Sequence, residues 1–163
     1  DHLRALRVAM ATTRPSHDGP YYRYDNVVVE PAAVQARVPF WIGGRTPRSL
    51  RRAIELGDGW CPFWLSVAKV TNMLDHARGT EAWDARERPL EIVLQNTRPI
   101  DPVASAEETR TTVDELVGCG ATTLSLRFVH HSLEHYLEQL EALVELVGPG
   151  GLGGLGGLGG LGG

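Results

Sequence analysis

Short apolar runs alternate with longer amphipathic stretches along most of the chain. The runs are rich in aromatic and β-branched residues, are short enough to be buried strands, and span residues 39–42, 59–64, 90–94 and 122–128. Stretches with apolar residues at helical spacing follow them in turn, over residues 47–56, 66–77, 105–117 and 132–147. This alternation predicts four β–α units whose parallel strands are joined by right-handed crossovers.

Polar residues at the helix starts support this assignment. Thr46 is an N-cap candidate, and Pro47 after it suits the first helical position. Ser105 is followed three residues later by Glu108, which is a capping-box pattern. Ser132 is a plausible N-cap of the last helix.

The first part of the chain has a different pattern. A helical pattern from Leu3 to Met10 stops before Pro15. The tyrosine-rich residues 21–24 and the β-prone residues 27–29 suggest a hairpin-like excursion, and residues 30–37 indicate an extended linker.

Two architectures are compatible with this order of elements. Each β–α unit takes about 30 residues, so four units and a leading helix correspond to half of a (β/α)8 TIM barrel. Four strands could also form a small open doubly wound sheet. Periodicity alone does not separate the two, and the fold class is α/β with parallel strands in both.

The chain divides into a folded part and a tail. Residues 148–163 read GPGGLGGLGGLGGLGG and hold 11 of the 19 glycines. A Gly-Gly-Leu repeat has too few apolar atoms to form a core, so it predicts a disordered low-complexity tail. Residues 1–147 are the predicted barrel domain, and we expect a chain truncated after Val147 to fold.

Composition excludes several classes of protein. The net charge of −4 and the pI near 5.9 argue against a protein that binds nucleic acid or a membrane surface. No apolar run reaches the roughly 18 residues of a membrane span. Cys61 and Cys119 form no CxxC motif, which favours free thiols in a reducing cytoplasm. The arginine-rich composition suggests a bacterial source with GC-rich DNA, and the chain begins at Asp1, without methionine, inside a predicted helix.

The most informative chemistry lies where the first predicted strand meets its helix. Gly43 and Gly44 allow a sharp turn and a close approach of a ligand to the backbone. The amides of the helix N-terminus, the hydroxyls of Thr46 and Ser49, and the guanidinium of Arg45 could converge on one anion. The alternative is a plain tight turn between strand and helix.

The segment from Val38 to Trp64, VPFWIGGRTPRSLRRAIELGDGWCPFW, resembles the luciferase-like monooxygenase family. Within that family it is most similar to bacterial oxidoreductases that use the deazaflavin coenzyme F-420, whose typical pattern is P-x-W-x-G-G-R-[ST], then L-R-R-A, then L-G-D-G-W. The matching positions are Pro39, Trp41, Gly43, Gly44, Arg45, Thr46, Leu50–Ala53 and Leu56–Trp60. The hairpin-like excursion that precedes this segment is also similar to the family. The resemblance covers residues 1–147 and is weak after about residue 66.

The resemblance implies a (β/α)8 barrel and a bound coenzyme. It implies that Gly43, Gly44, Arg45 and Thr46 contact the coenzyme near its phosphate and ribityl chain, with Ser49 as a looser addition. The protein would transfer a hydride between F-420 and a small organic substrate. FMN-dependent monooxygenation is the alternative chemistry within the family.

The chain departs from the family in one large respect, because the first four β–α units are absent. Those units carry much of the coenzyme pocket and usually the acid and base residues. A third alternative is therefore a truncated half-barrel without catalytic activity. A half-barrel exposes two sheet edges and an apolar face, which predicts self-association or a homo-oligomer.

Further candidates follow the last predicted strand. His130 and His131 would lie at the C-terminal end of the barrel strands, where a histidine can act as a catalytic acid or base. The alternative is that they form a polar cap before the last helix. Arg127 could pair with a coenzyme phosphate. His131 and His135 have i, i+4 spacing, but no third ligand is at a familiar spacing, so we expect no metal site.

Two kinds of residue in the Gly-rich segment have alternative interpretations. Asp58, between two glycines, is typical of an Asx turn, or its carboxylate fixes the loop that opens the next strand. Trp41, Trp60 and Trp64 are expected in the core, with stacking on a flavin ring as the alternative.

Overall fold

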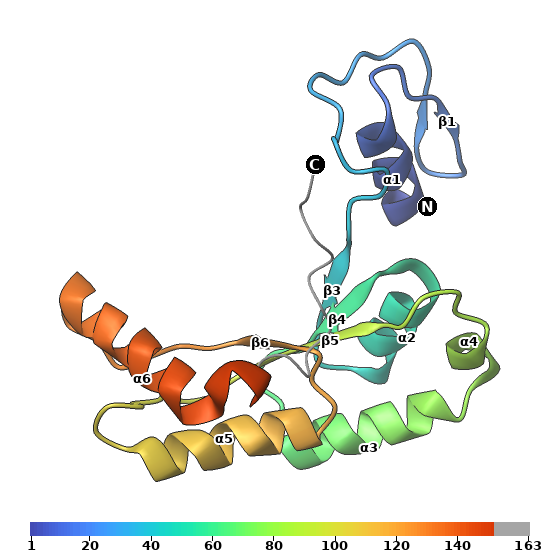
Figure 1. Ribbon diagram of the computed structural model, residues 1–163. Coiled ribbons are helices and arrows are strands. Elements are labelled where there is room, and N and C mark those ends of the chain that lie inside the picture. The colour runs from blue at the N-terminus through green and yellow to red at the C-terminus, as the bar shows by residue number, and fades with distance from the viewer. Residues whose placement is uncertain (152–163) are drawn as a thin grey trace.

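The computed structural model of the protein describes residues 1–151, with side chains described as far as residue 148. The elements in chain order are α1 (His2–Ala11), β1 (His17–Asp18), β2 (Arg23–Tyr24), β3 (Trp41–Gly43), α2 (Pro47–Leu56), β4 (Gly59–Cys61), α3 (Val67–Arg78), α4 (Glu81–Asp84), β5 (Glu91–Gln95), α5 (Ala106–Gly118), β6 (Thr123–Ser125) and α6 (Leu133–Gly151). Figure 1 shows α1, β1 and β2 as a lobe set apart from the sheet and its helices. The predicted alternation of strands and helices is confirmed.

The larger sheet decides between the two predicted architectures. It contains β3, β4, β5 and β6 in that order, and each neighbouring pair is parallel. This order lacks the reversal that defines a doubly wound sheet. Right-handed crossovers between successive neighbours place the connecting helices on one face of the sheet, as Figure 1 shows. The fold is therefore half of a (β/α)8 barrel.

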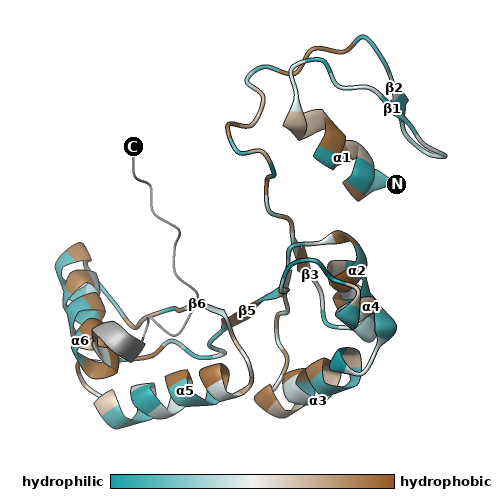
Figure 2. Ribbon diagram, turned by 45° about the vertical axis from the view of Figure 1, so that its right-hand side comes forward, coloured by the Kyte–Doolittle hydropathy of each residue, from teal (hydrophilic) through white to brown (hydrophobic). Residues whose placement is uncertain are grey.

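The helix-facing side of the sheet forms the main core. Successive residues of a strand point to opposite faces, so alternate strand residues meet the helices. This core contains Ile42, Leu50, Ala53, Ile54, Trp60, Val70, Leu74, Ala77, Leu90, Ile92, Leu94, Leu116, Cys119 and Ala121. In Figure 2, hydrophobic and hydrophilic residues alternate around α3 and α5, as helices with one buried face require.

The other face of the sheet would line the interior of a complete barrel. At its N-terminal end Trp41 lies over Gly59, where an added Cβ would stand 2.6 Å from the Trp41 ring. The Trp41 indole donates a hydrogen bond to Glu91 Oε2 at 2.8 Å. Trp41 is half exposed, because the strands that would face it in a full barrel are not among these four.

A second, smaller core joins α5 and α6 to the end of the sheet. It is formed by Ile100, Val113, Phe128 and Leu143. Fully buried Gln139 of α6 lies beside it. The Gln139 amide donates to Asp101 Oδ1 at 2.8 Å and to the Val129 carbonyl at 3.1 Å, and its oxygen accepts from Val103 N at 3.1 Å. Gln139 thus fixes α6 on the two loops that it covers.

We expect Gln139→Leu to be one of the more destabilising substitutions. It would leave the partly buried hydrogen-bonding groups of Asp101, Val103 and Val129 without their partner, so the free energy of unfolding should fall by about 1–3 kcal/mol. Urea denaturation measures this change. Glu138→Gln, at an exposed neighbouring position, is the control and should change stability by less than about 0.5 kcal/mol.

The structure corrects several local predictions. The hairpin pairs His17 with Tyr24 and Asp18 with Arg23, whereas residues 27–29 form no strand. Tyr24 connects this hairpin to α1, since its Oη donates to the Ala5 carbonyl at 2.6 Å. The strands β3, β4 and β6 are also shorter than predicted, whereas β5 has the predicted length, and α4 was not predicted at all.

The predicted capping box at Ser105 is wrong. Ser105 is the N-cap residue of α5, but its side chain makes no capping hydrogen bond, and its ψ of 58° turns it away from the usual cap geometry. The capping box occurs instead at α2, between Thr46 and Ser49. The first turn of α5 has the favourable charges of Glu107 and Glu108.

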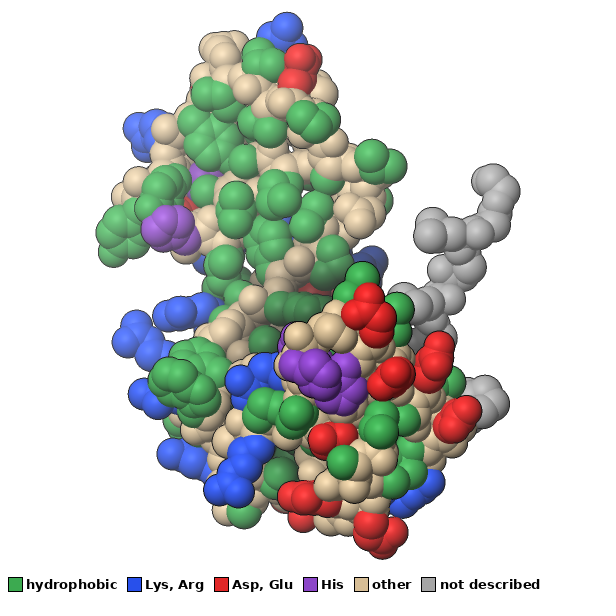
Figure 3. Space-filling model, turned by 90° about the vertical axis from the view of Figure 1, so that its left-hand side faces the viewer, with side chains coloured by type: hydrophobic (Ala, Val, Ile, Leu, Met, Phe, Trp, Pro, Cys, Tyr) green, Lys and Arg blue, Asp and Glu red, His purple; other side chains and the backbone are tan. Residues whose placement is uncertain are grey.

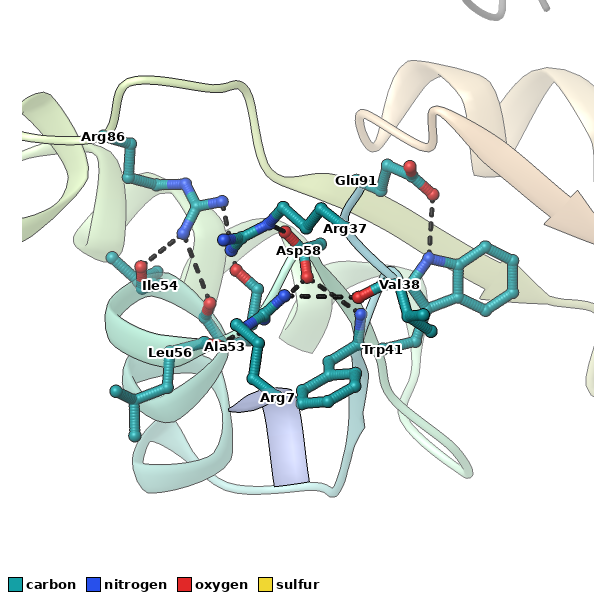
Figure 4. Close-up of polar contacts among 12 residues, drawn as sticks. Arg7, Arg37, Val38, Trp41, Ala53, Ile54, Leu56, Asp58, Arg86 and Glu91 are labelled. Atoms are coloured by element: carbon teal, nitrogen blue, oxygen red, sulfur yellow. Dashed lines mark hydrogen bonds and ion pairs between the residues drawn. The ribbon is translucent and has the colours of Figure 1, made fainter. Parts of the chain in front are cut away.

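An ion-pair cluster joins the N-terminal lobe to the N-terminal ends of the strands (Figure 4). Asp58, just before β4, accepts from Arg7 of α1 at 2.8 Å and from Arg37 at 2.7 Å. Its carboxylate also accepts from Phe40 N at 2.9 Å. Asp58 therefore fixes the loop through long-range contacts, as one of the two interpretations has it, and the Asx-turn interpretation is wrong.

The electrostatics of Asp58 reflect these contacts. Burial by itself raises the pKa of Asp58. Hydrogen bonds from Phe40, Arg7 and Arg37 and the charge of Arg7 together lower it by more, so the net pKa lies below the usual 3.8. Nearby Arg86 donates to the carbonyls of Ala53, Ile54 and Gly57 at the end of α2. Burial lowers the pKa of Arg86, and the charge of Asp58 opposes that effect.

The described chain ends inside the predicted tail, because α6 continues to Gly151, past the predicted end of the last helix at residue 147. Gly148 interrupts α6 with a φ of 68°, one residue after the predicted end of the last helix. The predicted tail lies outside the described residues from residue 152 onward.

Among the helices that the structure describes, none is long and apolar enough to cross a membrane. Both cysteines are free.

Candidate functional site

The C-terminal edge of the sheet collects the candidate residues. The loops that follow β3, β4, β5 and β6 all leave the sheet at this edge because the strands are parallel. In β–α barrels this is the edge at which ligands bind. The residues of the Asp58 cluster lie at the opposite edge, where contacts serve stability.

The turn from β3 to α2 has the geometry of a tight, capped helix start. Gly44 has a φ of 136°, and an added Cβ would stand 2.5 Å from Ser49 Cβ. Thr46 Oγ1 accepts from Ser49 N at 3.3 Å, while Ser49 Oγ donates to the Thr46 carbonyl at 2.7 Å. Thr46 and Arg45 are exposed, and Ser49 is buried.

The Ser49 hydroxyl has different hydrogen-bond partners from the anion that was predicted for it. The hydroxyl lies inside the capping box and also accepts a hydrogen bond from the indole of buried Trp60 at 3.3 Å. Anion binding by Ser49 stays a prediction, and the geometry supports a positioning role for it. Gly43, Gly44, Arg45 and Thr46 form the accessible part of the turn.

The two glycines of this turn should respond differently to alanine. Gly44→Ala places a methyl group in a left-handed conformation and against Ser49, so we expect a loss of about 2–3 kcal/mol of stability. Gly43→Ala is the matched control, because the nearest atom to its Cβ is 3.8 Å away. Thermal unfolding of both variants tests this, and equal effects would contradict the assigned turn geometry.

Two aromatic residues that follow β4 extend the site. The Arg45 guanidinium lies 5.7 Å from the Phe63 ring centre and 5.8 Å from that of Trp64. The two rings are edge to face, 5.8 Å apart. Sequence reasoning considered Trp64 chiefly as core and missed Phe63, although the GWCPFW run placed both at the end of a strand. The structure confirms only Trp60 as a core residue of that segment.

Arg127 is held at the same edge by Asn96. The Asn96 amide donates to the carbonyls of Arg98 and Arg127 at 2.7 Å each, and its oxygen accepts from Arg127 N at 2.8 Å. The Arg127 guanidinium donates to the Thr97 carbonyl at 2.6 Å. Asn96 is buried and Arg127 is exposed, so a rigid loop presents the arginine to solvent. Sequence reasoning missed Asn96.

A pocket of about 100 Å³ lies between these groups. Trp64, Asn96, Thr97 and Arg127 form part of its wall, with apolar side chains of α3 and α5 at its base. The pocket therefore has Arg127 and Thr97 in its wall at the expected edge, whereas the side chain of Asn96 is paired with backbone groups. Its size suits a phosphate or carboxylate group.

The histidines lie beyond β6 at the start of α6. His130 Nδ1 is 3.0 Å from the Phe128 carbonyl oxygen, and its ring meets Tyr136 edge to face. The rings of His131 and His135 are 4.3 Å apart. Figure 3 shows a histidine cluster on one face, between mainly basic and mainly acidic side chains. Among the described residues, no group of three or more His, Cys, Asp or Glu could hold a metal ion.

Comparison with known protein families establishes the family of this chain. The sequence profile of the family described as luciferase-like monooxygenase matches residues 1–143. The chain belongs to this family. The match spans the lobe, the sheet and most of α6, so the luciferase-like assignment applies to the whole described fold. No curated protein matches the chain.

Solved structures to which the chain is similar are distant in sequence. An F420-dependent secondary alcohol dehydrogenase, solved in complex with an F420-acetone adduct, is 16% identical with a TM-score of 0.49, over 87% of this chain and 42% of that one. DmoA from Hyphomicrobium sulfonivorans is 16% identical with a TM-score of 0.40, over 61% of this chain and 22% of that one. The luciferase-like chain described here thus spans less than half of either protein.

Proposed function

We propose that the complete luciferase-like protein is an oxidoreductase that binds the deazaflavin F-420 and transfers a hydride to or from a small organic substrate. The observation that supports this most is the placement of Arg45 and Arg127 at one edge of the sheet, with Arg45 5.8 Å from the Trp64 ring and Arg127 in the pocket that Trp64 also lines. Guanidinium groups and a capped helix N-terminus suit the phosphate of such a coenzyme. The bound coenzyme would supply the redox chemistry.

The donor set fits the anionic end of the coenzyme. Arg127 lines the pocket, while Arg45 and Thr46 offer a charge and a hydroxyl from the neighbouring loop. Gly44 keeps that loop close to α2, because a side chain there would meet Ser49. These residues would bind and orient the phosphate and ribityl chain, while His130 and His131 stay candidates for proton transfer to the substrate.

FMN is the competing coenzyme because it carries the same ribityl phosphate. Parallel titrations of the full chain with F-420 and FMN, followed by absorbance, separate the two. We expect F-420 to bind more tightly, since the GGRTP…RRA…LGDGW pattern is closest to F-420 members. Tight binding of FMN without binding of F-420 would refute the choice. Binding of neither would favour the third possibility, a half-barrel without catalytic activity.

Substitution of the arginines tests the site itself. Arg127→Gln should weaken binding of either coenzyme by about tenfold or more, because a charge-assisted hydrogen bond to phosphate is lost. Arg52→Gln, an exposed arginine on α2, is the control and should leave the dissociation constant unchanged. Equal effects of the two substitutions would show only a general attraction of anions.

We also propose a cytoplasmic location, which the free thiols of Cys61 and Cys119 suit.

A further inference from the structure

Trp64 has an unusual backbone for its residue type. Its φ is +52°, and Asn26 is the other non-glycine residue with a positive φ in the described chain. This left-handed region is common for Asn but disfavoured for a bulky side chain, whose Cβ meets the following carbonyl oxygen. Strained residues of this kind persist where their surroundings hold them, and they cluster at ligand sites.

The strain does not serve to bury the ring. Trp64 is 79% exposed, the highest value among the four tryptophans. A large apolar ring that stays in solvent gains little from folding. The β4–α3 loop therefore holds Trp64 in a costly conformation that presents the indole at the C-terminal edge.

The neighbours of Trp64 indicate which kind of ligand could pack on the indole. Arg45 lies 5.8 Å from the ring centre, and Phe63 supports the ring edge to face. Trp64 also lines the pocket that contains Thr97 and Arg127. A flat conjugated ring on the indole would thus have cationic donors close by for an anionic substituent.

The other tryptophans do not have this position. Trp60 is fully buried in the core. Trp41 donates its indole N–H to Glu91 at the opposite end of the strands. Trp83 belongs to α4 and lies 6.0 Å from the Arg78 guanidinium.

We propose that Trp64 is an aromatic platform that stacks on the flat ring system of the coenzyme, while Arg127 and Arg45 hold the phosphate. This inference rests on the proposed function and deepens it. An indole stacks well on an electron-poor conjugated ring. The residue binds and orients the ring and takes no part in proton transfer.

The test uses the full chain, with FMN as a probe that has ring and phosphate, and ribitol 5-phosphate as a probe that has phosphate alone. Trp64→Ala should weaken FMN binding about threefold to tenfold, which is the usual range for one aromatic stack. It should leave ribitol 5-phosphate binding unchanged. Arg127→Gln should weaken both probes, and Trp83→Phe should change neither.

A stability measurement separates stacking from a structural role. Trp64→Gly removes both the ring and the backbone strain, so its melting temperature should rise by about 2–4 °C while FMN binding is lost as in Trp64→Ala. A structural residue would instead lose stability on this substitution. Trp64→Phe keeps a flat ring and should retain more FMN binding than Trp64→Ala.

The outcomes distinguish this inference from the proposed function. If the wild type binds FMN or F-420 and Trp64→Ala binds it equally well, the platform is refuted and the proposed function stands. If the wild type binds neither coenzyme, both are refuted. Equal weakening of FMN and ribitol 5-phosphate by Trp64→Ala would also overturn the platform, because stacking acts on the ring alone.

Discussion

Asp58→Ala should destabilise the protein by about 2–4 kcal/mol, because it leaves partly buried arginines and a backbone amide without their acceptor. The Asp58 carboxylate accepts from Arg7 at 2.8 Å and from Arg37 at 2.7 Å, and its side chain is 15% exposed. It also joins α1 to the start of β4. Urea denaturation at neutral pH measures the loss.

Asp75 offers a matched control for this substitution. It also pairs with an arginine, Arg78, at 3.1 Å, but the two side chains are 62% and 43% exposed. Exposed pairs contribute little because water screens them, so Asp75→Ala should change stability by less than about 1 kcal/mol. Similar losses in both variants would contradict the role assigned to Asp58.

The effect of Asp58 should depend on pH in a defined direction. Its pKa in the folded state is lowered from 3.8, so its stabilising contribution is present above the unfolded value and is lost as pH falls through the folded value. The difference in unfolding free energy between wild type and Asp58→Asn should therefore shrink as the pH falls from about 6 to about 2. A difference that grows on acidification would show that another group controls the titration.

The second large effect concerns association. We expect the full chain to form dimers or larger assemblies, because β3 and β6 each have a strand partner on one side only within the described sheet. Leu133 and Leu137 of α6, the helix that follows β6, add exposed apolar surface. Sedimentation velocity at several protein concentrations measures this, and a stable monomer at high concentration would contradict it.

Two controls identify the surface that associates. Leu137→Lys should shift the population toward monomer, whereas Leu6→Lys on α1 should not, although Leu6 and Leu137 are both 49% exposed. A chain truncated after Val147 should fold and associate like the full chain. Loss of association in that truncated chain would assign it to the Gly-Gly-Leu repeat instead of the open sheet.

The sequence predicted the long helices well because their signals are local. Pro47 at the first turn and the apolar spacing of α2 specify both ends of that helix within ten residues. The hairpin was placed wrongly because β propensity in residues 27–29 does not decide which strand finds a partner. Ser105 failed as a capping residue for a similar reason, since its backbone departs from cap geometry in a loop where Ala104 N and Ser105 N both donate to Asp101.

Part of the candidate site was also predictable. Gly43, Gly44, Arg45 and Thr46 are contiguous, so a short motif could name them. Asn96 and Phe63 belong to loops that are far apart in sequence, and their roles depend on contacts with Arg127 and Arg45. The exposure of Trp64 depends on a backbone angle that composition does not reveal.

The sequence by itself determined the order of β–α units, the family and the glycine turn before α2, because these depend on neighbouring residues and local periodicity. The tertiary structure decided between a half-barrel and a doubly wound sheet, since strand order is a matter of non-local pairing. It also decided that Asp58 holds the lobe and that Trp64 faces solvent. The first outcome depends on a residue distant in sequence, Arg7, which only the folded chain brings to Asp58, and the second depends on the backbone angle of Trp64.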